Sequence, residues 1–209
     1  MLDDFEKKIS SEGLHTYFNN IQIPAPQTIF EGVKKIRPAH GFLLDSRGHE
    51  TEKPYWKVDC TKKTKLSIGD AKEQLNLLML DSVKKMLVSD VPIGLLLSGG
   101  VDSSLILALA NEAGRQGLRT FTVGNNSEEL EDEEFKRAKK IASQFNSKNY
   151  AHDFGKTEFN QLVEAAKVCD EPIGILEICY LFAIFGKIKD HVKVVLTGNG
   201  ADEIFGGYV

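Results

Sequence analysis

The stretch that decides the fold is Leu95–Ser104, which reads LLLSGGVDSS. The apolar run Ile93–Leu97 predicts a short buried strand, and the apolar residues of Val101–Ala113 predict a helix. Ser98–Gly100 separates the two as a turn. A passage from strand to turn to helix places the turn at the carboxyl end of the strand, where open α/β sheets bind ligands. The stretch therefore predicts an α/β fold with a ligand at this turn.

The turn has the composition of a phosphate-binding loop. Its glycines and hydroxyl residues are Ser98, Gly99, Gly100, Ser103 and Ser104. Glycine lets the backbone approach an anion closely, so that successive N–H groups and the positive end of the following helix can point at it. Asp102 would repel a phosphate by itself, which favours a role as a ligand of Mg²⁺ that bridges to the phosphate.

A purely structural interpretation stays open for the same residues. Ser-Gly-Gly can be an ordinary turn, with Asp102 or Ser103 capping the helix. The complete string SGGxDS is more specific than a pair of glycines. It lacks the GK[ST] of a Walker A loop and the GxGxxG of dinucleotide-binding folds. We therefore predict a pyrophosphate unit, that of ATP, as the ligand.

Strands and helices are expected to alternate through most of the chain. Helical spacing predicts helices over residues 67–87, 101–113, 135–145, 159–168 and 178–188, and apolar runs predict strands over 93–97, 118–123, 150–154 and 193–196. Alternation of this kind is typical of βαβ units. It predicts an α/β fold with a parallel sheet and flanking helices.

A second glycine-rich turn follows the last expected strand. The stretch Val194–Tyr208 reads VVLTGNGADEIFGGY, with Asp202 and Glu203 at the start of a short helix. Alone, it is equally compatible with a plain glycine turn whose acidic pair interacts with the helix dipole. Two strand ends of one sheet can converge on one ligand, which favours a shared binding site.

The first sixty residues differ in composition from the rest. They hold four of the six prolines, at positions 24, 26, 38 and 54. A short helix is expected over Leu14–Phe18, and strands over Thr28–Val33 and Gly41–Leu44. This part has too few apolar positions for a core of its own. We expect a small β-rich segment that forms a hairpin or the edge of a neighbouring sheet.

Composition and charge exclude several classes of protein. Hydrophobic residues make up 42% and charged residues 27% of the chain, which excludes collagen-like and disordered proteins. A net charge of −4 argues against nucleic acid as the main partner. Cys60, Cys169 and Cys179 show no CxxC spacing, so neither a disulfide framework nor a zinc site is expected. Met1–Ser10 has no feature of a signal peptide and the longest apolar run, Ile178–Phe185, is too short to span a bilayer, so we expect a cytoplasmic protein.

Together, SGGVDSS at 98–104 and VVLTGNGADEIFGGY at 194–208 closely resemble the synthetase domain of glutamine-hydrolysing asparagine synthetases, members of the PP-loop ATP pyrophosphatase superfamily. Other segments that match are Ile29–His40, Tyr55–Trp56, Ser89–Gly94, Phe121–Gly124, Glu133–Ala138 and Asp170–Pro172. The resemblance implies a fold of the PP-loop, or adenine nucleotide α-hydrolase-like, type. It also implies that residues 1–60 are a β-rich remnant of the glutaminase domain with its linker. Residues 61–209 would then be the synthetase domain, incomplete at its carboxyl end.

The resemblance also implies an activity: an ATP-dependent, AMP-forming ligase that converts aspartate and ammonia to asparagine through β-aspartyl-AMP. The β- and γ-phosphates of ATP would be held by Ser98, Gly99, Gly100, Asp102, Ser103 and Ser104. Adenosine would be contacted by Leu96, Val123, Thr197 and Gly198. Asp102 and Asp202 would coordinate Mg²⁺ and act as the catalytic residues, so ATP and Mg²⁺ are the expected cofactors.

Four features depart from the pattern of the family. Leu2 stands where its glutaminase has a cysteine nucleophile, so no glutamine hydrolysis is expected. Asn199 replaces an acidic residue that many members carry, and an amide cannot act as a base. Ile175–Glu177 replaces a polar stretch on the substrate side. The chain also stops at Val209, so we expect a piece of a longer enzyme that works with a partner chain or a missing domain.

Two other functions stay open. The chain could be a different PP-loop adenylating enzyme, for example one acting on tRNA or on another carboxylate; the GADEIFGGY stretch and the absence of a basic face argue against tRNA. It could also be an ATP-binding subunit that is inactive on its own.

Overall fold

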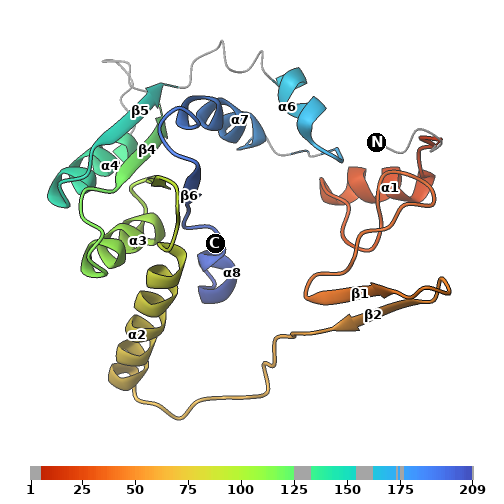
Figure 1. Cartoon of the computed structure of the whole chain (residues 1–209), viewed down its shortest axis with the longest axis horizontal. Helices are drawn as coiled ribbons and strands as arrows, with labels where there is room; N and C mark the ends of the chain where they lie inside the picture. The colour runs from red at the N-terminus through yellow and green to blue at the C-terminus, as the bar shows by residue number, and fades with distance from the viewer. Residues whose placement is uncertain (1–5, 125–132, 154–161, 173, 175–176, 209) are drawn as a thin grey trace. The chain divides into compact units, whose positions relative to one another are not determined.

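The computed structural model describes residues 6–124, 133–153, 162–172, 174 and 177–208 (Figure 1). These residues fall into two compact units. The first consists of residues within Met1–Lys65 and Val163–Ile178, and the second of residues within Leu66–Leu162 and Cys179–Val209. The segment 163–178 therefore groups with the amino-terminal residues. The origin of residues 1–60 in a glutaminase domain stays a prediction.

A hairpin and two helices make up the regular structure among the described residues of the first unit. Its elements are α1 (Ser11–Asn20), β1 (His40–Leu44), β2 (Glu50–Pro54) and α6 (Leu162–Val168). α1 begins where the hydroxyl of Ser10 accepts a hydrogen bond from Gly13 N (3.0 Å). β1 and β2 pair antiparallel, with Phe42 opposite Glu52. A hairpin is therefore present, and its first strand includes the predicted strand Gly41–Leu44.

The strand predicted over Thr28–Val33 is wrong. This stretch contains a single isolated bridge, between Ile9 and Phe30. The hydroxyl of Thr28 accepts from Phe30 N (3.1 Å) and donates to Val33 O (2.9 Å). Such local side-chain hydrogen bonds give the backbone an alternative to strand pairing, and the chain turns here.

A four-stranded parallel sheet forms the centre of the second unit. Its strands are β3 (Ile93–Leu96), β4 (Arg119–Gly124), β5 (Asn149–Asp153) and β6 (Val194–Leu196), in the order β5-β4-β3-β6. The predicted parallel sheet is confirmed. Because the strands are parallel, all four carboxyl ends lie at one edge of the sheet. The position 154 that we assigned to the third strand lies outside the described residues.

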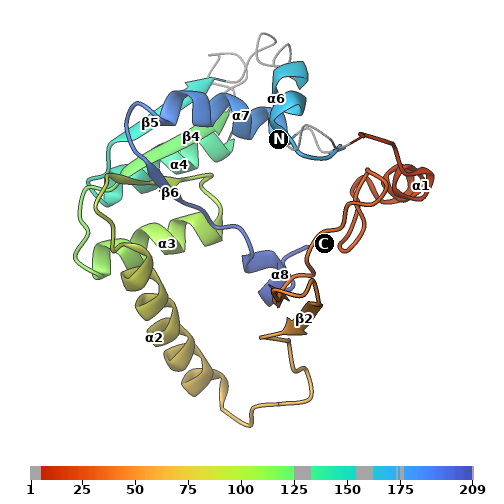
Figure 2. The same ribbon diagram turned by 45° about the vertical axis from the view of Figure 1, so that its right-hand side comes forward.

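Helices cover both faces of this sheet (Figure 2). α3 (Val101–Glu112) and α4 (Glu133–Gln144) lie on one face and α7 (Glu177–Ile188) on the other. This unit also contains α2 (Ile68–Met86) and the short α8 (Ala201–Phe205). α2 starts as predicted, with Ser67 Oγ accepting from Asp70 N (3.1 Å). Residues 159–161 of the helix predicted over 159–168 lie outside the described residues. Among the residues that are described, no helix combines the length and the apolar character needed to cross a membrane.

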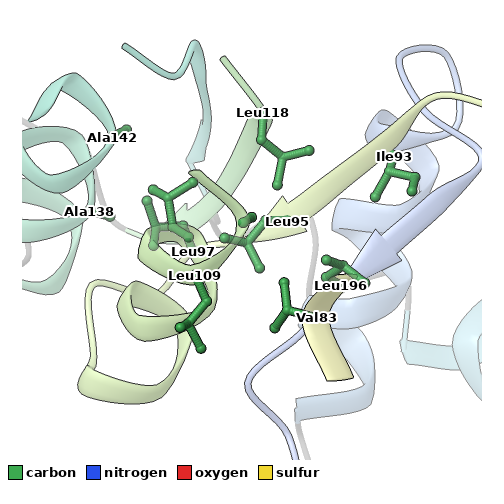
Figure 3. Packing of buried hydrophobic residues seen from close by; sticks show 11 residues of the cluster. Val83, Ile93, Leu95, Leu97, Leu109, Leu118, Ala138, Ala142 and Leu196 are labelled. Atoms are coloured by element: carbon green, nitrogen blue, oxygen red, sulfur yellow. The ribbon is translucent and has the colours of Figure 1, made fainter. Parts of the chain in front are cut away.

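Two apolar clusters hold the helices on the sheet. The larger lies on the side of α3 and α4 and includes Leu95, Leu97, Leu107, Leu109, Leu118, Ala138 and Ala142 (Figure 3). The smaller packs α7 on the opposite face, through Phe121, Ile184, Ile188 and Val192. Leu95 and Leu97 are 0% and 1% exposed, so the strand that leads into the first glycine turn is among the most buried parts of the unit. Burial of this apolar surface is the main force that fixes the strand, and with it the turn.

Candidate functional site

The first glycine turn joins β3 to α3, as the sequence predicts. α3 begins at Val101, with Gly100 as its N-cap residue and no side chain capping its first turn. Asp102 and Ser103 lie inside the helix, so the alternative in which one of them caps it is not observed. The N–H groups at this end of α3 are therefore left for solvent or for a ligand.

Serine hydroxyls hold this turn together from within. Ser98 Oγ lies 3.0 Å from Ser103 Oγ and accepts from Gly100 N (3.2 Å). Ser98 N donates to Ser103 Oγ (3.3 Å), and Ser104 Oγ donates to Gly100 O (2.6 Å). Ser103 is 5% exposed, whereas Ser98 is exposed at the surface. The hydroxyl of Ser103 thus shapes the turn, and Ser98 is the serine of this turn that is most accessible from outside.

Gly99 gives the turn its shape because no other residue fits there. Its φ is +82°, in the left-handed region that side chains rarely adopt. A Cβ at this position would also lie 2.7 Å from Glu134 O and 2.8 Å from Ala138 N. The backbone of the turn therefore packs directly against the first turns of α4, and this packing fixes the position of the turn.

The second glycine turn meets the first. β6 pairs directly with β3, so the turn after Leu196 starts beside the turn after Leu96. A Cβ on Gly198 would lie 3.0 Å from Asp102 Cβ and 3.0 Å from Ser103 N. Such spacing means that the backbone of Gly198 touches the first turn of α3. The two motifs that the sequence places a hundred positions apart form one surface.

Asp102 and Asp202 occupy equivalent positions in different helices. Each is the second residue of its helix, after an N-cap glycine, and each is half-buried. Asp202 O accepts hydrogen bonds from Gly206 N (2.8 Å) and Gly207 N (3.1 Å). Its carboxylate lies so close to Gly207 that a side chain there would collide with it. The glycine pair of the GGY stretch therefore wraps around Asp202.

The acidic residue next to Asp202 is held by the end of the same stretch. Tyr208 Oη donates to Glu203 Oε1 (2.7 Å). This hydrogen bond holds the pKa of the Glu203 carboxyl below its usual value. Glu203 is exposed, so this contact acts mainly by folding residues 206–208 back over α8.

Leu96 and Val123 lie on neighbouring strands, near the same edge as the turns. Both are half-buried and pack against the cluster of Phe121 and α7. They therefore present apolar surface on the α7 face of the sheet. Thr197 and Gly198 continue this edge after β6, and Thr197 Oγ1 accepts from Asn199 N (3.4 Å). The four residues expected to contact adenosine thus come from three adjacent strand ends.

Sequence reasoning missed the role of Glu171 in the first unit. Its carboxylate accepts from Ile29 N (3.0 Å) and forms an ion pair with Lys35. Gly174 N donates to Ile21 O (3.1 Å) in the same region. These contacts fix the segment 170–174 on the amino-terminal residues. The sole signal in the sequence was that Asp170–Pro172 belongs to the family-like segments.

The architecture defines a protein of the PP-loop class: a parallel α/β sheet in which the glycine turns after two adjacent strands meet at a helix N-terminus. Comparison with known proteins narrows the class. The family model described as "Asparagine synthase" matches residues 74–209. The chain therefore belongs to the asparagine synthase family.

Individual relatives agree with this assignment. Asparagine synthetase [glutamine-hydrolyzing] 1 of Bacillus subtilis is 33% identical over 96% of this chain and 31% of its own length. A putative asparagine synthetase [glutamine-hydrolyzing] 2 of Methanocaldococcus jannaschii is 30% identical over 98% of this chain and 39% of its own length. The chain spans about a third of the length of these curated relatives. Among solved structures, an NH3-dependent NAD synthetase from Campylobacter jejuni superposes with a TM-score of 0.45 at 16% identity, over 66% of this chain and 60% of its own.

Proposed function

We propose that this chain is the synthetase part of an ATP-dependent, AMP-forming ligase that converts aspartate and ammonia to asparagine. The observation that carries the proposal is the contact of Gly198 with Asp102 and Ser103, because it joins both family motifs into one surface. The names of the relatives support the amide product. Ammonia would come from a glutaminase domain or partner chain, and the enzyme would work in the cytoplasm.

The nucleotide would lie along the edge formed by the two turns. Backbone N–H groups of the turn 98–104, with Ser98 Oγ, would receive the β- and γ-phosphates, and the free end of α3 favours negative charge there. Adenosine would lie over Leu96, Val123, Thr197 and Gly198. The apolar, half-buried character of Leu96 and Val123 supports this orientation.

Magnesium fits the donor set at this edge. Carboxylate and phosphate oxygens are the ligands that Mg²⁺ prefers, and it usually keeps several waters rather than a complete protein cage. The described residues contain no cluster of three or more ligating side chains, so phosphate and water oxygens would have to complete the coordination. Asp102, beside Gly198, and Asp202 would hold the ion, which when bound neutralises charge on the pyrophosphate.

The proposed reaction has two steps. An oxygen of the aspartate β-carboxylate attacks the α-phosphorus, the bond from that phosphorus to the β-phosphate oxygen breaks, and pyrophosphate leaves. Ammonia then attacks the acyl carbon, loses a proton to solvent, and AMP leaves with the acyl oxygen. The chain's part is positioning and charge neutralisation by the turn 98–104, which are the main sources of rate in phosphoryl transfer.

One assay tests the proposal. The chain receives Mg-ATP, aspartate and ammonium, and AMP, pyrophosphate and asparagine are measured. Stoichiometric AMP, pyrophosphate and asparagine are expected, and Asp102→Ala is expected to abolish them together with Mg-ATP binding. AMP with a different carboxylate, but none with aspartate, would assign the chain to another adenylating enzyme. Mg-ATP binding that does not change in Asp102→Ala would contradict the metal role.

A second function has an observation in its favour. Asn199 supplies an amide where many members of the family carry an acid, and it is exposed in the second turn. A chain that binds Mg-ATP but forms no AMP would be an ATP-binding subunit that depends on a partner for chemistry.

A further inference from the structure

A buried chain of polar side chains crosses the sheet toward the first glycine turn. Thr120 and Thr122 on β4 are 0% and 2% exposed. Asn149 on β5 lies opposite Thr120 in the sheet register, and its Nδ2 lies 3.0 Å from Thr120 Oγ1 and 2.9 Å from Thr122 Oγ1. This series of polar side chains ends at Thr122, whose Oγ1 lies 2.8 Å from the carbonyl oxygen of Leu97. Leu97 is the residue before the turn.

The direction of each hydrogen bond follows from counting protons. Thr122 has one hydroxyl hydrogen, and the carbonyl of Leu97 has none to offer, so Thr122 donates to Leu97. Thr122 then needs a donor from Asn149, which sets the amide with its Nδ2 toward the threonines. Among the described residues, Asn149 Oδ1 is buried without a hydrogen-bond partner. The amide of Asn149 therefore acts in this network through the hydrogens of its Nδ2, at the expense of leaving a buried acceptor unmet, which is unfavourable.

Leu97 is held at both of its backbone groups by β4. Its N–H donates to Phe121 O (2.8 Å), and its carbonyl accepts from Thr122. β3 itself ends one residue earlier, at Leu96. Leu97 is therefore the last fixed point before Ser98, whose N–H already belongs to the turn through Ser103 Oγ.

We propose that Thr122 and Asn149 are positioning residues that hold Leu97, and with it the turn 98–104, in the arrangement that receives the phosphates of a nucleotide. The proposal rests on the nucleotide function proposed above. Neither residue touches the ligand. Loss of the Thr122 hydroxyl would leave the buried carbonyl of Leu97 without a donor, and the turn would move to find one. The effect would fall on the phosphates, because Leu96 and Val123 keep their packing on the other face.

The chain offers a matched control. Thr120 lies two residues away on the same strand and face, is equally buried and accepts a hydrogen bond from the same amide. Among the described residues, however, the hydrogen bond to the carbonyl of Leu97 comes from Thr122 and not from Thr120. Thr122→Val and Thr120→Val therefore make the same chemical change at sites that differ in their link to the turn. Thr122→Ser keeps the hydroxyl and tests rescue.

The test measures binding of Mg-ATP and of adenosine to the full chain by calorimetry. Thr122→Val is expected to weaken Mg-ATP on the order of tenfold more than it weakens adenosine, the factor typical of one lost buried hydrogen bond. Thr120→Val is expected to leave the ratio of the two affinities unchanged, and Thr122→Ser to restore most of it. Equal loss for both ligands in Thr122→Val, or the same ratio in both valine variants, would overturn the proposal.

Two further measurements keep the result decisive. If Thr122→Val does not fold, Asn149→Ala takes its place. A smaller loss in the same ratio of affinities is then expected, and no change in that ratio would overturn the proposal.

Amide hydrogen exchange of residues 98–104 is measured in the nucleotide-free chain. Faster exchange there in Thr122→Val (or in Asn149→Ala) than in Thr120→Val supports the positioning role, and equal exchange contradicts it. Absence of Mg-ATP binding to the unmodified chain would reject the nucleotide function. Amide hydrogen exchange would still decide whether Thr122 and Asn149 position the turn 98–104.

Discussion

Gly198 is the residue at which the two glycine turns touch, and its missing side chain makes the contact possible. In Gly198→Ala the new methyl group would lie 3.0 Å from Asp102 Cβ and 3.0 Å from Ser103 N. One turn must move away by a few tenths of an ångström, with about 1–3 kcal/mol of strain. We expect Mg-ATP affinity to fall roughly tenfold, measured by calorimetry.

The control for this change is Gly186→Ala. Gly186 lies inside α7 with no atom within 4 Å of the new methyl group. Alanine is the better helix former, so a gain of about 0.5–1 kcal/mol in stability is expected with unchanged affinity. An unchanged affinity in Gly198→Ala would contradict the shared surface.

Asn199 stands where the resemblance to the family leads us to expect an acidic residue. In Asn199→Glu a carboxylate replaces an exposed amide that cannot take up a proton. If the position serves the acyl transfer step, AMP formation should rise by about 10²-fold, the lower end of what a positioned base contributes. The rate of AMP release with aspartate and ammonium measures this. Asn199→Gln adds the same length without the charge and should leave the rate low; equal rates in both variants would count against a base at this position.

At the scale of elements, the segment 170–174 is tied to the amino-terminal residues rather than to its neighbours in sequence. Glu171→Ala would leave Ile29 N without its acceptor and Lys35 without its carboxylate, while Lys35 Nζ would still donate to Ile23 O. We expect a loss of about 2–3 kcal/mol in the free energy of unfolding, and about 1 kcal/mol for Lys35→Met, which leaves the bond to Ile29 in place. Urea unfolding of the single and double variants gives their coupling energy, expected at about 0.5–3 kcal/mol.

The pair Asp81 and Lys85 on α2 is the matched comparison for this cycle. Its side chains are 2.6 Å apart but far more exposed, at 58% and 75%. Exposed pairs four residues apart on a helix couple by about 0.3–0.5 kcal/mol. A coupling between Glu171 and Lys35 no larger than this would show that the ion pair does not hold the segment.

The elements that sequence predicts well are those whose signals are local and agree with one another. β3 and α3 follow from an apolar run, two glycines and an apolar helix, and all three signals fall within Ile93–Glu112. The stretch 28–33 has an apolar pattern as well, but the hydroxyl of Thr28 forms hydrogen bonds with Phe30 N and Val33 O and stabilises a turn there. A single side-chain contact of this kind overrides a short apolar pattern, and composition does not reveal it.

At the scale of the whole molecule, the chain folds back on itself between distant segments. Residues 56–66 contain no helix or strand and are exposed, with lysines at 57, 62, 63 and 65. Trypsin should cut first in this stretch. The amino-terminal fragment should nevertheless stay bound to the rest in native buffer, because Glu171 and Gly174 hold it through their contacts with Ile29, Lys35 and Ile21. Size-exclusion chromatography of the nicked chain measures this.

Glu171→Ala provides the comparison for the nicked chain, since it removes the central contact. Fragments that separate without any substitution would show that the contacts of Glu171 and Gly174 are too weak to join the segments. Fragments that stay together in both proteins would place the attachment elsewhere.

The predicted site also shows what local sequence patterns cannot predict, namely contacts between residues far apart in the chain. The sequence predicts both turns, and a parallel sheet predicts that they share an edge. It does not predict that Gly198 touches Ser103, that Thr122 donates to the carbonyl of Leu97, or that Asn149 donates to Thr122. These contacts join residues 25–95 positions apart. Contacts of that span are set by strand order and register, which no local pattern carries.

The pairing of β3 with β6 has a consequence for synthesis. Ile93 and Val194 are neighbours in the sheet but are about a hundred positions apart in the chain. At ~5–20 residues per second, roughly 5–20 s separate the appearance of the two strands on a ribosome. During that interval the nascent chain has the first glycine turn but not the second, and the edge of β3 that will pair with β6 is unpaired. Nucleotide that binds to both turns can stabilise the fold by mass action only once β6 has been added, so ligand-assisted folding has to wait for that strand.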